Sequence, residues 1–388
     1  MTPTTSSGSA TVDIADVRFR HFRAPTTDGV GMAFGPLTHR SLVLIEIESA
    51  AGVVGYGESW VNYPSWAATE RLATLAEGVA PLLRGHNAGH PVAIHDRLVQ
   101  RLGPLGRQWG APGPIMQAIS GVDIALWDLR ARSLAVSVTE LLGGRTRSQV
   151  PVYASSLGPT DVEATAQRCV DLGFGCVKVK VGFGQEVDRA NLRTCREVVG
   201  PDVTVVADAN QAWTLAEALA ACDMLQESDV SWIEEPLKGD RLEDIEAFAS
   251  RSGMGVATGE NIYGLDGFLP YLNSPHIAVY QPDVTKTGGL TETARICEAA
   301  SSLGRLVMPH LYGGAVAFAA TLQLAARFAV IDRVEYDVRS NPLRDPIMVA
   351  PLSLIDGMLT IPDGPGLGIE LDQNALARHE VGAARASD

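Results

Sequence analysis

Three acidic residues recur at one spacing in the middle of the chain, each where a strand-like run ends. Asp208 ends VTVVAD, Glu234 lies in WIEEP and Glu260 lies in TGEN, and each is 26 residues from the next. One βα unit is about that long, so consecutive units would place the three carboxylates side by side at the C-terminal mouth of a barrel. Such neighbours repel one another unless a cation neutralises them, and ligation by oxygen alone suits Mg²⁺, with Mn²⁺ as a substitute. The triplet therefore predicts a metal site.

Two lysines precede the acids in the strand-like segment VKVKVG. Lys178 and Lys180 are two residues apart, so their side chains point to the same face of a strand. In a barrel that face can be the interior, while the flanking valines fill the other face. Two ammonium groups that are close, partly desolvated and near a divalent cation lower each other's pKa, which allows one of them to act as a base near neutral pH. We interpret the pair as catalytic, the alternative being a solvated edge strand.

An acid and a histidine follow two later strand-like runs. Asp283 in QPDVTKTGG and His310 in MPHLYGG are 27 residues apart, again one βα unit. The two side chains could therefore touch, and the carboxylate would fix the imidazole tautomer and raise its basicity. Lys286, three residues after Asp283, either adds a charge to this network or faces solvent.

The elements that would hold these residues predict an α/β protein of two parts. Residues 12–145 combine strand-like runs with three helical periodicities, which indicates an N-terminal α+β capping domain. Residues 146–350 alternate strand-like and helix-like segments, which favours a modified (β/α)7β TIM-type barrel over an open sheet. We expect residues 1–11 to form a disordered tail and residues 351–388 to form a C-terminal segment that returns to the capping domain. The expected barrel strands are 150–154, 176–181, 203–208, 231–235, 255–259, 277–281, 306–309 and 334–337.

Composition restricts the partners and the compartment. The net charge of -14 disfavours nucleic acid and anionic membranes, which are bound through excess Lys and Arg. The five cysteines are odd in number and scattered, which fits reduced thiols and a cytoplasmic protein. We expect a homo-oligomer whose partner is a small-molecule carboxylate substrate.

The combined pattern resembles the enolase superfamily and, within it, the mandelate racemase subgroup of the mandelate racemase/muconate lactonizing enzyme family. The resemblance spans most of the chain, because the K-x-K strand, the acid triplet, the Asp/His pair and the ending PGLGIELD agree in type, order and spacing. It implies a carboxylate substrate bound to one Mg²⁺ per subunit, abstraction of the α-proton and a metal-stabilised enediolate.

The same resemblance implies a role for each polar residue of the site. Lys180 is then the base on one face of the substrate, and His310 is the acid or base on the other. Lys178 contacts the substrate carboxylate and tunes its neighbour, and Asn210 lines the site. Glu335, in VEYD on the last strand, would be the acid that hydrogen-bonds the substrate carboxylate.

Bases on two faces permit two outcomes, racemisation by reprotonation and dehydration by loss of a β-hydroxyl. By the resemblance, members with both K-x-K and an Asp/His pair are mostly acid-sugar dehydratases, so we expect a hydro-lyase that forms a 2-keto-3-deoxy acid. A racemase or epimerase of a mandelate-like 2-hydroxy acid is the alternative. A cycloisomerase or dipeptide epimerase would be expected to carry a lysine where the Asp/His pair stands.

Two further classes are weighed. A non-catalytic barrel acting as a binding protein is disfavoured by the complete set of acids, bases and ligands. A nicotinamide enzyme is suggested by GFG at 182–184, but the third glycine of G-x-G-x-x-G would be position 187, which is Val187.

Loops of the capping domain are expected to select the substrate. The candidates are DGVGMAFGPLTHR at 28–40 and ESWVNYPSW at 58–66. Among their residues we expect His39 and Trp60 to bind substrate, together with Lys286 and Asn210 of the barrel.

Overall fold

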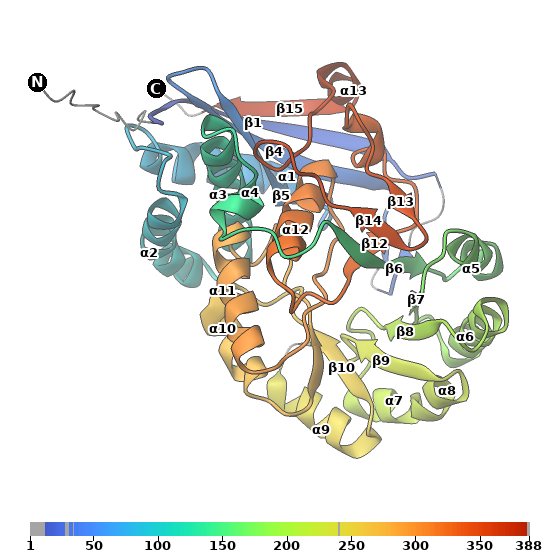
Figure 1. Ribbon diagram of the computed structural model, residues 1–388. Helices are drawn as coiled ribbons and strands as arrows, with labels where there is room; N and C mark the ends of the chain where they lie inside the picture. Colours follow the sequence, from blue (N-terminus) through green and yellow to red (C-terminus); the bar gives the residue numbers. More distant parts are fainter. Residues whose placement is uncertain (1–11, 28–30, 34, 240, 386–388) are drawn as a thin grey trace, which may run out of the picture.

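The computed structural model describes residues 12–27, 31–33, 35–239 and 241–385. The expected tail at 1–11 and part of the first capping loop lie outside the described residues. The chain forms an α+β capping domain above a barrel (Figure 1). No helix in the described ranges combines the length and the apolar character needed to span a bilayer.

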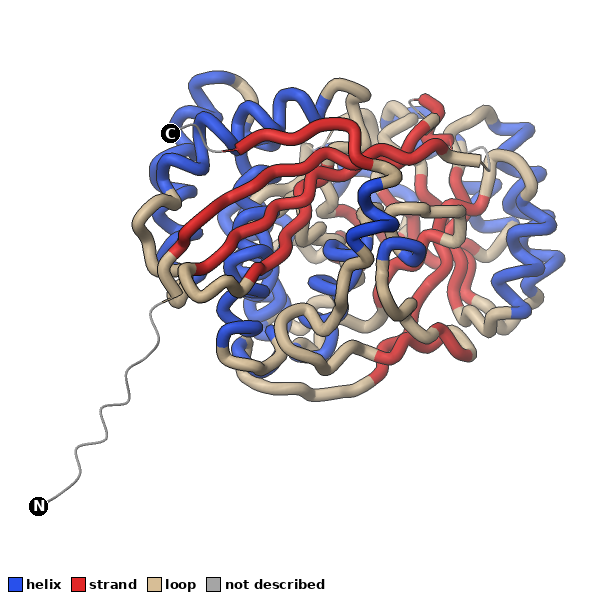
Figure 2. The backbone as a smooth tube through the Cα atoms, turned by 90° about the horizontal axis from the view of Figure 1, so that it is seen from above, coloured by secondary structure: helices blue, strands red, loops and turns tan. Residues whose placement is uncertain are grey.

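The capping domain is a four-stranded antiparallel sheet in the order β15-β1-β4-β5, covered on one face by helices. Apolar residues of β1 and β4, such as Phe19 and Ile45, are fully buried against apolar residues of the helices, such as Leu98 and Ile119. Figure 2 shows the long strands of this sheet side by side at one end of the molecule. The elements up to the barrel are β1 (Ile14–Pro25), β2 (Gly31–Met32), β3 (Gly35–Pro36), β4 (His39–Ser49), β5 (Val54–Trp60), α1 (Ala67–Ala73), η1 (Thr74–Val79), η2 (Ala80–Leu82), α2 (Pro91–Trp109), α3 (Pro112–Ser133) and α4 (Val138–Leu141).

The barrel follows as parallel strands, each succeeded by helix on the outside. Its elements are β6 (Gln149–Leu157), α5 (Val162–Asp171), β7 (Cys176–Lys180), α6 (Gln185–Val199), β8 (Thr204–Asp208), α7 (Leu215–Ala220), α8 (Cys222–Glu227), β9 (Val230–Glu234), α9 (Leu242–Ser252), β10 (Gly255–Thr258), α10 (Gly264–Leu272), β11 (Ile277–Tyr280), α11 (Gly289–Ser302), α12 (Ala315–Arg327) and β12 (Val334–Asp337). Strand residues alternate between two buried environments, as barrel strands require. Val177 and Val179 pack with the helices, whereas Cys176 joins an interior cluster with Val206.

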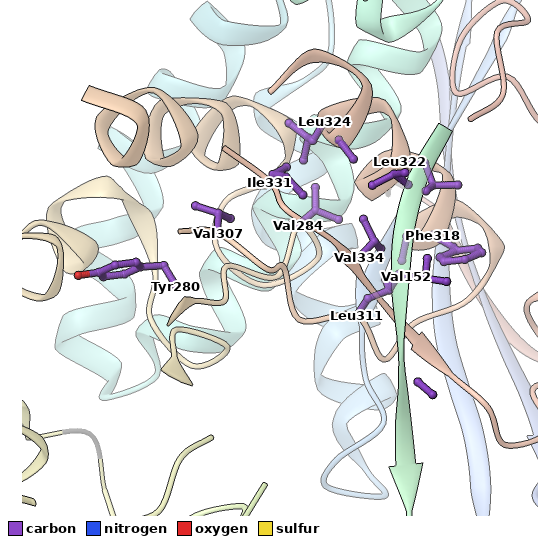
Figure 3. Packing of buried hydrophobic residues seen from close by; sticks show 14 of the residues in the cluster. Val152, Tyr280, Val284, Val307, Leu311, Phe318, Leu322, Leu324, Ile331 and Val334 are labelled. Carbon is purple, nitrogen blue, oxygen red and sulfur yellow. The ribbon is translucent and has the colours of Figure 1, made fainter. Parts of the chain in front are cut away.

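Closure of the barrel explains one difference from the expected strands. The segment 306–309, predicted as a strand, contributes a single bridging residue, Val307, which pairs with Tyr280 on one side and Ile331 on the other. β12 then pairs in parallel with β6 and closes the ring. The expected (β/α)7β barrel is therefore confirmed, with its seventh strand shortened to a bridge. Val307 and Ile331 belong to the apolar cluster between this segment and α12, drawn in Figure 3.

The C-terminal segment contacts both parts of the molecule. It follows η3 (Asp345–Ile347) and contains β13 (Leu354–Ile355), β14 (Met358–Thr360), α13 (Gln373–Ala377) and β15 (Glu380–Arg385). β14 pairs antiparallel with β6 of the barrel, and β15 pairs antiparallel with β1 of the capping sheet.

Candidate active site

The acidic strand ends lie at the same edge of the barrel. Lys180 on β7 is directly opposite Asp208 on β8, and Asp208 is opposite Glu234 on β9. Glu260 follows the end of β10, the next strand around the barrel. The equal spacing in the sequence thus places the three carboxylates on consecutive strands at one mouth.

Both lysines are buried and held by these acids. Lys178 Nζ lies 2.7 Å from Glu234 Oε2 and 2.9 Å from Glu335 Oε1. Lys180 donates to Asp208 and, at 3.0 Å, to Asn210 Oδ1. Burial lowers the pKa of Lys180 and so does Lys178, but Asp208 outweighs them and the pKa lies above its ordinary value. The predicted lowering of the Lys180 pKa by Lys178 is therefore present, but the neighbouring carboxylates outweigh it.

The predicted Asp/His pair is in contact. His310 Nδ1 lies 2.7 Å from Asp283 Oδ2, and His310 Nε2 lies 3.0 Å from Glu260 Oε2. Burial lowers the pKa of His310, but the negative charges of Glu260 and Asp283 have the larger effect together and raise this pKa to about 9. Asp283 also accepts from the hydroxyl of Thr285, and its pKa lies below the ordinary value because His310 and Thr285 outweigh burial. An imidazole held in this way can carry a proton at neutral pH.

The acid triplet fits a divalent cation. Oε1 of Glu234 is buried and accepts no hydrogen bond from the described residues, whereas its Oε2 accepts from Lys178 and Gln281. Burial, together with the negative charges of Asp208 and other acids nearby, raises the pKa of Glu234 to about 7. A buried carboxylate oxygen without a donor, among like charges, is the environment that a cation relieves.

A second acidic group lies between the capping domain and the barrel. His95, Asp96 and Glu292 place one ligand atom each within 4.8 Å of one another, the one such group of potential metal ligands found among the described residues. Arg295 donates to Asp96 at 2.9 Å and to Glu292 at 2.6 Å. A guanidinium therefore already pairs with both carboxylates of this group.

Four of the catalytic candidates, Lys178, Lys180, His310 and Glu335, line a pocket of about 680 Å³ between the capping domain and the barrel mouth. The predicted substrate-binding residues Asn210, Lys286 and Trp60 line it too. Asp283 is buried and does not line the described pocket wall. Lys286 Nζ lies 4.8 Å from the centre of the Trp60 ring, donates to Asn261 Oδ1 at 2.8 Å and lies 3.8 Å from Glu260. Lys286 is therefore buried in the site, and its alternative placement facing solvent is excluded.

Two predicted residues lie elsewhere or in another state. His39 is absent from the described pocket wall, and its Nδ1 contacts Arg23 and Thr38. Alternation along β4 turns its neighbour Arg40 inward, into a buried ion pair with Asp337. Glu335 lines the pocket, but Lys178 and His310 outweigh burial and lower its pKa to about 2. An ionised Glu335 cannot donate a hydrogen bond to a substrate carboxylate.

Several lining residues were not anticipated. They come from loops whose folding the sequence does not reveal: Gln211, Lys238, Gly239, Asn261, Tyr263 and Tyr312. Met32 and Tyr63 also line the pocket, and they belong to the expected segments 28–40 and 58–66. One signal was available for Gln211, which directly follows Asn210. Both residues have left-handed backbones, with φ of 62° and 43°, and such conformations concentrate at functional sites.

Comparison with known proteins agrees with this geometry. Residues 14–143 match the mandelate racemase / muconate lactonizing enzyme N-terminal domain, and residues 161–375 match the enolase C-terminal domain-like family. A fold that couples this capping domain to this barrel, with acids and bases at the mouth, defines an enzyme of the enolase superfamily. The chain belongs to the mandelate racemase / muconate lactonizing enzyme family of that superfamily.

Individual relatives differ in the reaction they are named for. D-galactarolactone cycloisomerase of Agrobacterium fabrum is 33% identical over 88% of this chain and 92% of its own. Arabinonate dehydratase of Saccharolobus solfataricus is 31% identical over 90% of this chain and 92% of its own. The structure of a racemase from Streptomyces coelicolor with bound magnesium has a TM-score of 0.84 and 28% identity, and covers 95% of this chain and 100% of the other.

Proposed function

We propose that the enzyme dehydrates an acid sugar to a 2-keto-3-deoxy acid in a Mg²⁺-dependent reaction that begins with abstraction of the α-proton. One observation carries the proposal: the base and the acid stand at opposite ends of the arc of carboxylates. Lys180 contacts Asp208 at one end, and His310 contacts Glu260 at the other. A substrate carboxylate bound at this arc would have its α-carbon between the two groups.

The cation is held, in this proposal, by Asp208, Glu234 and Glu260. When bound, it supplies the positive charge that makes the α-proton of a carboxylate acidic enough for an amine to remove. Manganese would serve in the same way.

The protein's own groups then move two protons. With Asp208 bound to the cation, the charge that raises the pKa of Lys180 would be neutralised, and the free amine of Lys180 would accept the proton from the α-carbon while the C–H electron pair moves toward the carboxylate. His310, protonated and oriented by Asp283, donates from Nε2 to the β-hydroxyl, which leaves as water with the electrons of the C–O bond. The resulting enol gains a proton at the β-carbon, loses the proton of its 2-hydroxyl and becomes the 2-keto-3-deoxy acid. Glu335 orients Lys178, which contacts the substrate carboxylate.

Unpaired donors in the pocket wall favour a hydroxylated substrate. Trp60 and Tyr312 line the pocket, and their Nε1 and hydroxyl groups are buried and have no hydrogen-bond partner among the described residues. A polyol chain would satisfy both groups, whereas an aromatic ring would leave them unpaired at a cost of about 1–3 kcal/mol each.

Two other outcomes of the same first step remain candidates for specific reasons. Racemisation needs only reprotonation by His310, and the racemase from Streptomyces coelicolor shares the fold. Cycloisomerisation, which the sequence disfavoured, is supported by the relative named D-galactarolactone cycloisomerase.

Product analysis by NMR in D₂O distinguishes these outcomes over a panel of aldonic acids, aldaric acids, their lactones and mandelate. We expect one sugar acid to give a 2-keto-3-deoxy product. His310→Asn should abolish that product while Lys180 still exchanges the α-proton for deuterium, and His276→Asn, a histidine outside the pocket, should behave as the wild type. Inversion without a keto product would identify the enzyme as a racemase. Ring opening of a lactone would identify it as a cycloisomerase, and no turnover of any carboxylate would indicate a binding protein.

A further inference from the structure

The segment Leu311–Gly314, here called the His310 loop, joins the catalytic histidine to helix α12. Side chains from outside the loop bind its backbone at four successive residues. From the barrel, Glu335 accepts from Leu311 N at 2.9 Å and Asn341 donates to Gly313 O at 2.9 Å. Figure 3 shows Leu311 within the apolar cluster that includes Phe318 of α12. These contacts fix the loop from the barrel side.

The other two contacts come from the capping domain. Glu58 on β5 is 1% exposed, and its two oxygens accept from Gly314 N at 2.6 Å and from Ala317 N at 3.0 Å. The carboxylate therefore caps the N-terminus of the 13-residue helix α12, where free N–H groups and the helix dipole favour a negative charge.

Asn62, just after β5, binds the backbone of Tyr312, which lies between Leu311 and Gly313 in the His310 loop. Its Nδ2 donates to Tyr312 O at 2.8 Å, and its Oδ1 accepts from Ser41 N of β4 at 3.0 Å. The side chain thus connects the backbone of the capping sheet to the backbone of the His310 loop.

Glycines allow this close approach. A Cβ on Gly313 would lie 2.8 Å from Oε1 of Glu58, and a Cβ on Gly314 would lie 2.7 Å from the carbonyl oxygen of Leu343. The sequence LYGG after His310 therefore makes room for a side chain that belongs to the other domain.

We infer that Glu58 and Asn62 are positioning residues that hold His310 in place from the capping domain. Neither residue needs to touch substrate, and neither lines the pocket among the described residues. The capping domain thereby positions His310, the proposed acid, but does not position Lys180, the proposed base. Lys180 lies on β7 and is held by barrel residues. This inference rests on the proposed role of His310 as proton donor.

The test compares Glu58→Ala, Glu58→Gln and Asn62→Ala with Glu46→Gln. Glu46 is a buried carboxylate of the capping sheet that pairs with Arg18 and Arg20 and does not contact the His310 loop. The first measurement is amide hydrogen exchange of the full chain with Mg²⁺, which needs no substrate. Exchange over residues 311–317 should become about 10- to 100-fold faster in Glu58→Ala, less so in Glu58→Gln, and remain unchanged in the control.

The second measurement separates the acid from the base on the sugar acid that the wild type converts. In Glu58→Ala and Asn62→Ala, kcat for product formation should fall about 10- to 100-fold with KM changed less than about 3-fold, while α-proton exchange with deuterium persists. Glu58→Gln should recover part of the loss, because its amide oxygen can still accept one hydrogen bond.

The two hypotheses fail in different ways. Unchanged exchange at 311–317, or equal losses of α-proton exchange and product formation, would overturn the positioning role. Faster exchange at 311–317 in Glu58→Ala, combined with a wild-type enzyme that converts no sugar acid, would support the loop contacts and overturn the proposed function instead.

Discussion

The assignment of the cation to the barrel mouth can be tested with one pair of variants. Glu234→Gln removes the charge of the carboxylate whose Oε1 is buried without a donor, while its amide oxygen can still accept from Lys178. Glu292→Gln makes the same change in the rival acidic group beside Arg295. Mg²⁺ should stabilise the wild type and Glu292→Gln against heat and leave Glu234→Gln unaffected.

The size of the effect follows from binding linkage. Mg²⁺ at about 100 times its dissociation constant stabilises the folded state by about 2.7 kcal/mol. For 388 residues the unfolding entropy is about 0.8 kcal/mol/K, taken at about 2.1 cal/mol/K per residue. The expected increase in Tm is therefore about 3 °C.

The stabilisation by Mg²⁺ should also depend on pH, and it should increase as the pH rises. The pKa of Glu234 is raised to about 7, so its carboxyl is mostly protonated below that pH and the cation must displace the proton. Affinity for Mg²⁺ should thus rise as pH increases through 7, and the Tm shift at pH 6 should be smaller than at pH 8 by about 1–2 °C.

Differential scanning calorimetry in EDTA and in Mg²⁺, at both pH values, measures these shifts. A Mg²⁺ shift that survives in Glu234→Gln and disappears in Glu292→Gln would move the cation to the group at the domain interface. An equal shift at pH 6 and pH 8 would show that Glu234 is already ionised and would refute the electrostatic argument.

Three further predictions concern side chains around the site and between the domains. Trp60→Phe keeps a ring over Lys286 but removes Nε1–H, so KM for the sugar acid should rise about 5- to 10-fold in steady-state kinetics, and an unchanged KM would contradict a hydroxyl contact. Burial raises the pKa of Asp123 to about 6, so the folded chain holds a proton that the unfolded chain releases, and stability should fall by up to about 3 kcal/mol as pH rises from about 4 to 6. Urea unfolding should show this loss in the wild type and not in Asp123→Asn. Arg40→Met leaves the buried Asp337 without its ion pair to Arg40 and should cost about 3–5 kcal/mol in urea unfolding, which a second change, Asp337→Leu, should largely restore.

The residues of the barrel site could be predicted from the sequence because the patterns that place them lie within single strands or recur from one βα unit to the next. Strand periodicity put Lys178 and Lys180 on one face, and the 26-residue repeat put Asp208, Glu234 and Glu260 on consecutive strand ends. Both patterns survive small errors in strand boundaries, since the parallel strands of a barrel all end at the same mouth.

The contribution of the capping domain was not accessible in this way. Glu58 and Gly314 are 256 residues apart, and no periodicity links a strand of one domain to a loop of the other. His39 was chosen where Arg40 is the inward residue, because a one-residue shift in a strand exchanges its faces and the sequence does not fix which face is covered. The raised pKa of Lys180 depends on Asp208 lying against it, a contact that only the folded barrel defines.

The pairing of β15 with β1 has a consequence for how the chain is made. Arg20 of β1 and Glu380 of β15 bind each other across 360 residues, so β1 is synthesised long before its partner strand. During translation β1 presents an unpaired edge, and the slow closure of so long a loop extends that exposure. A chain that lacks residues 380–385 would therefore leave the β15 side of β1 unpaired, and such an edge favours aggregation.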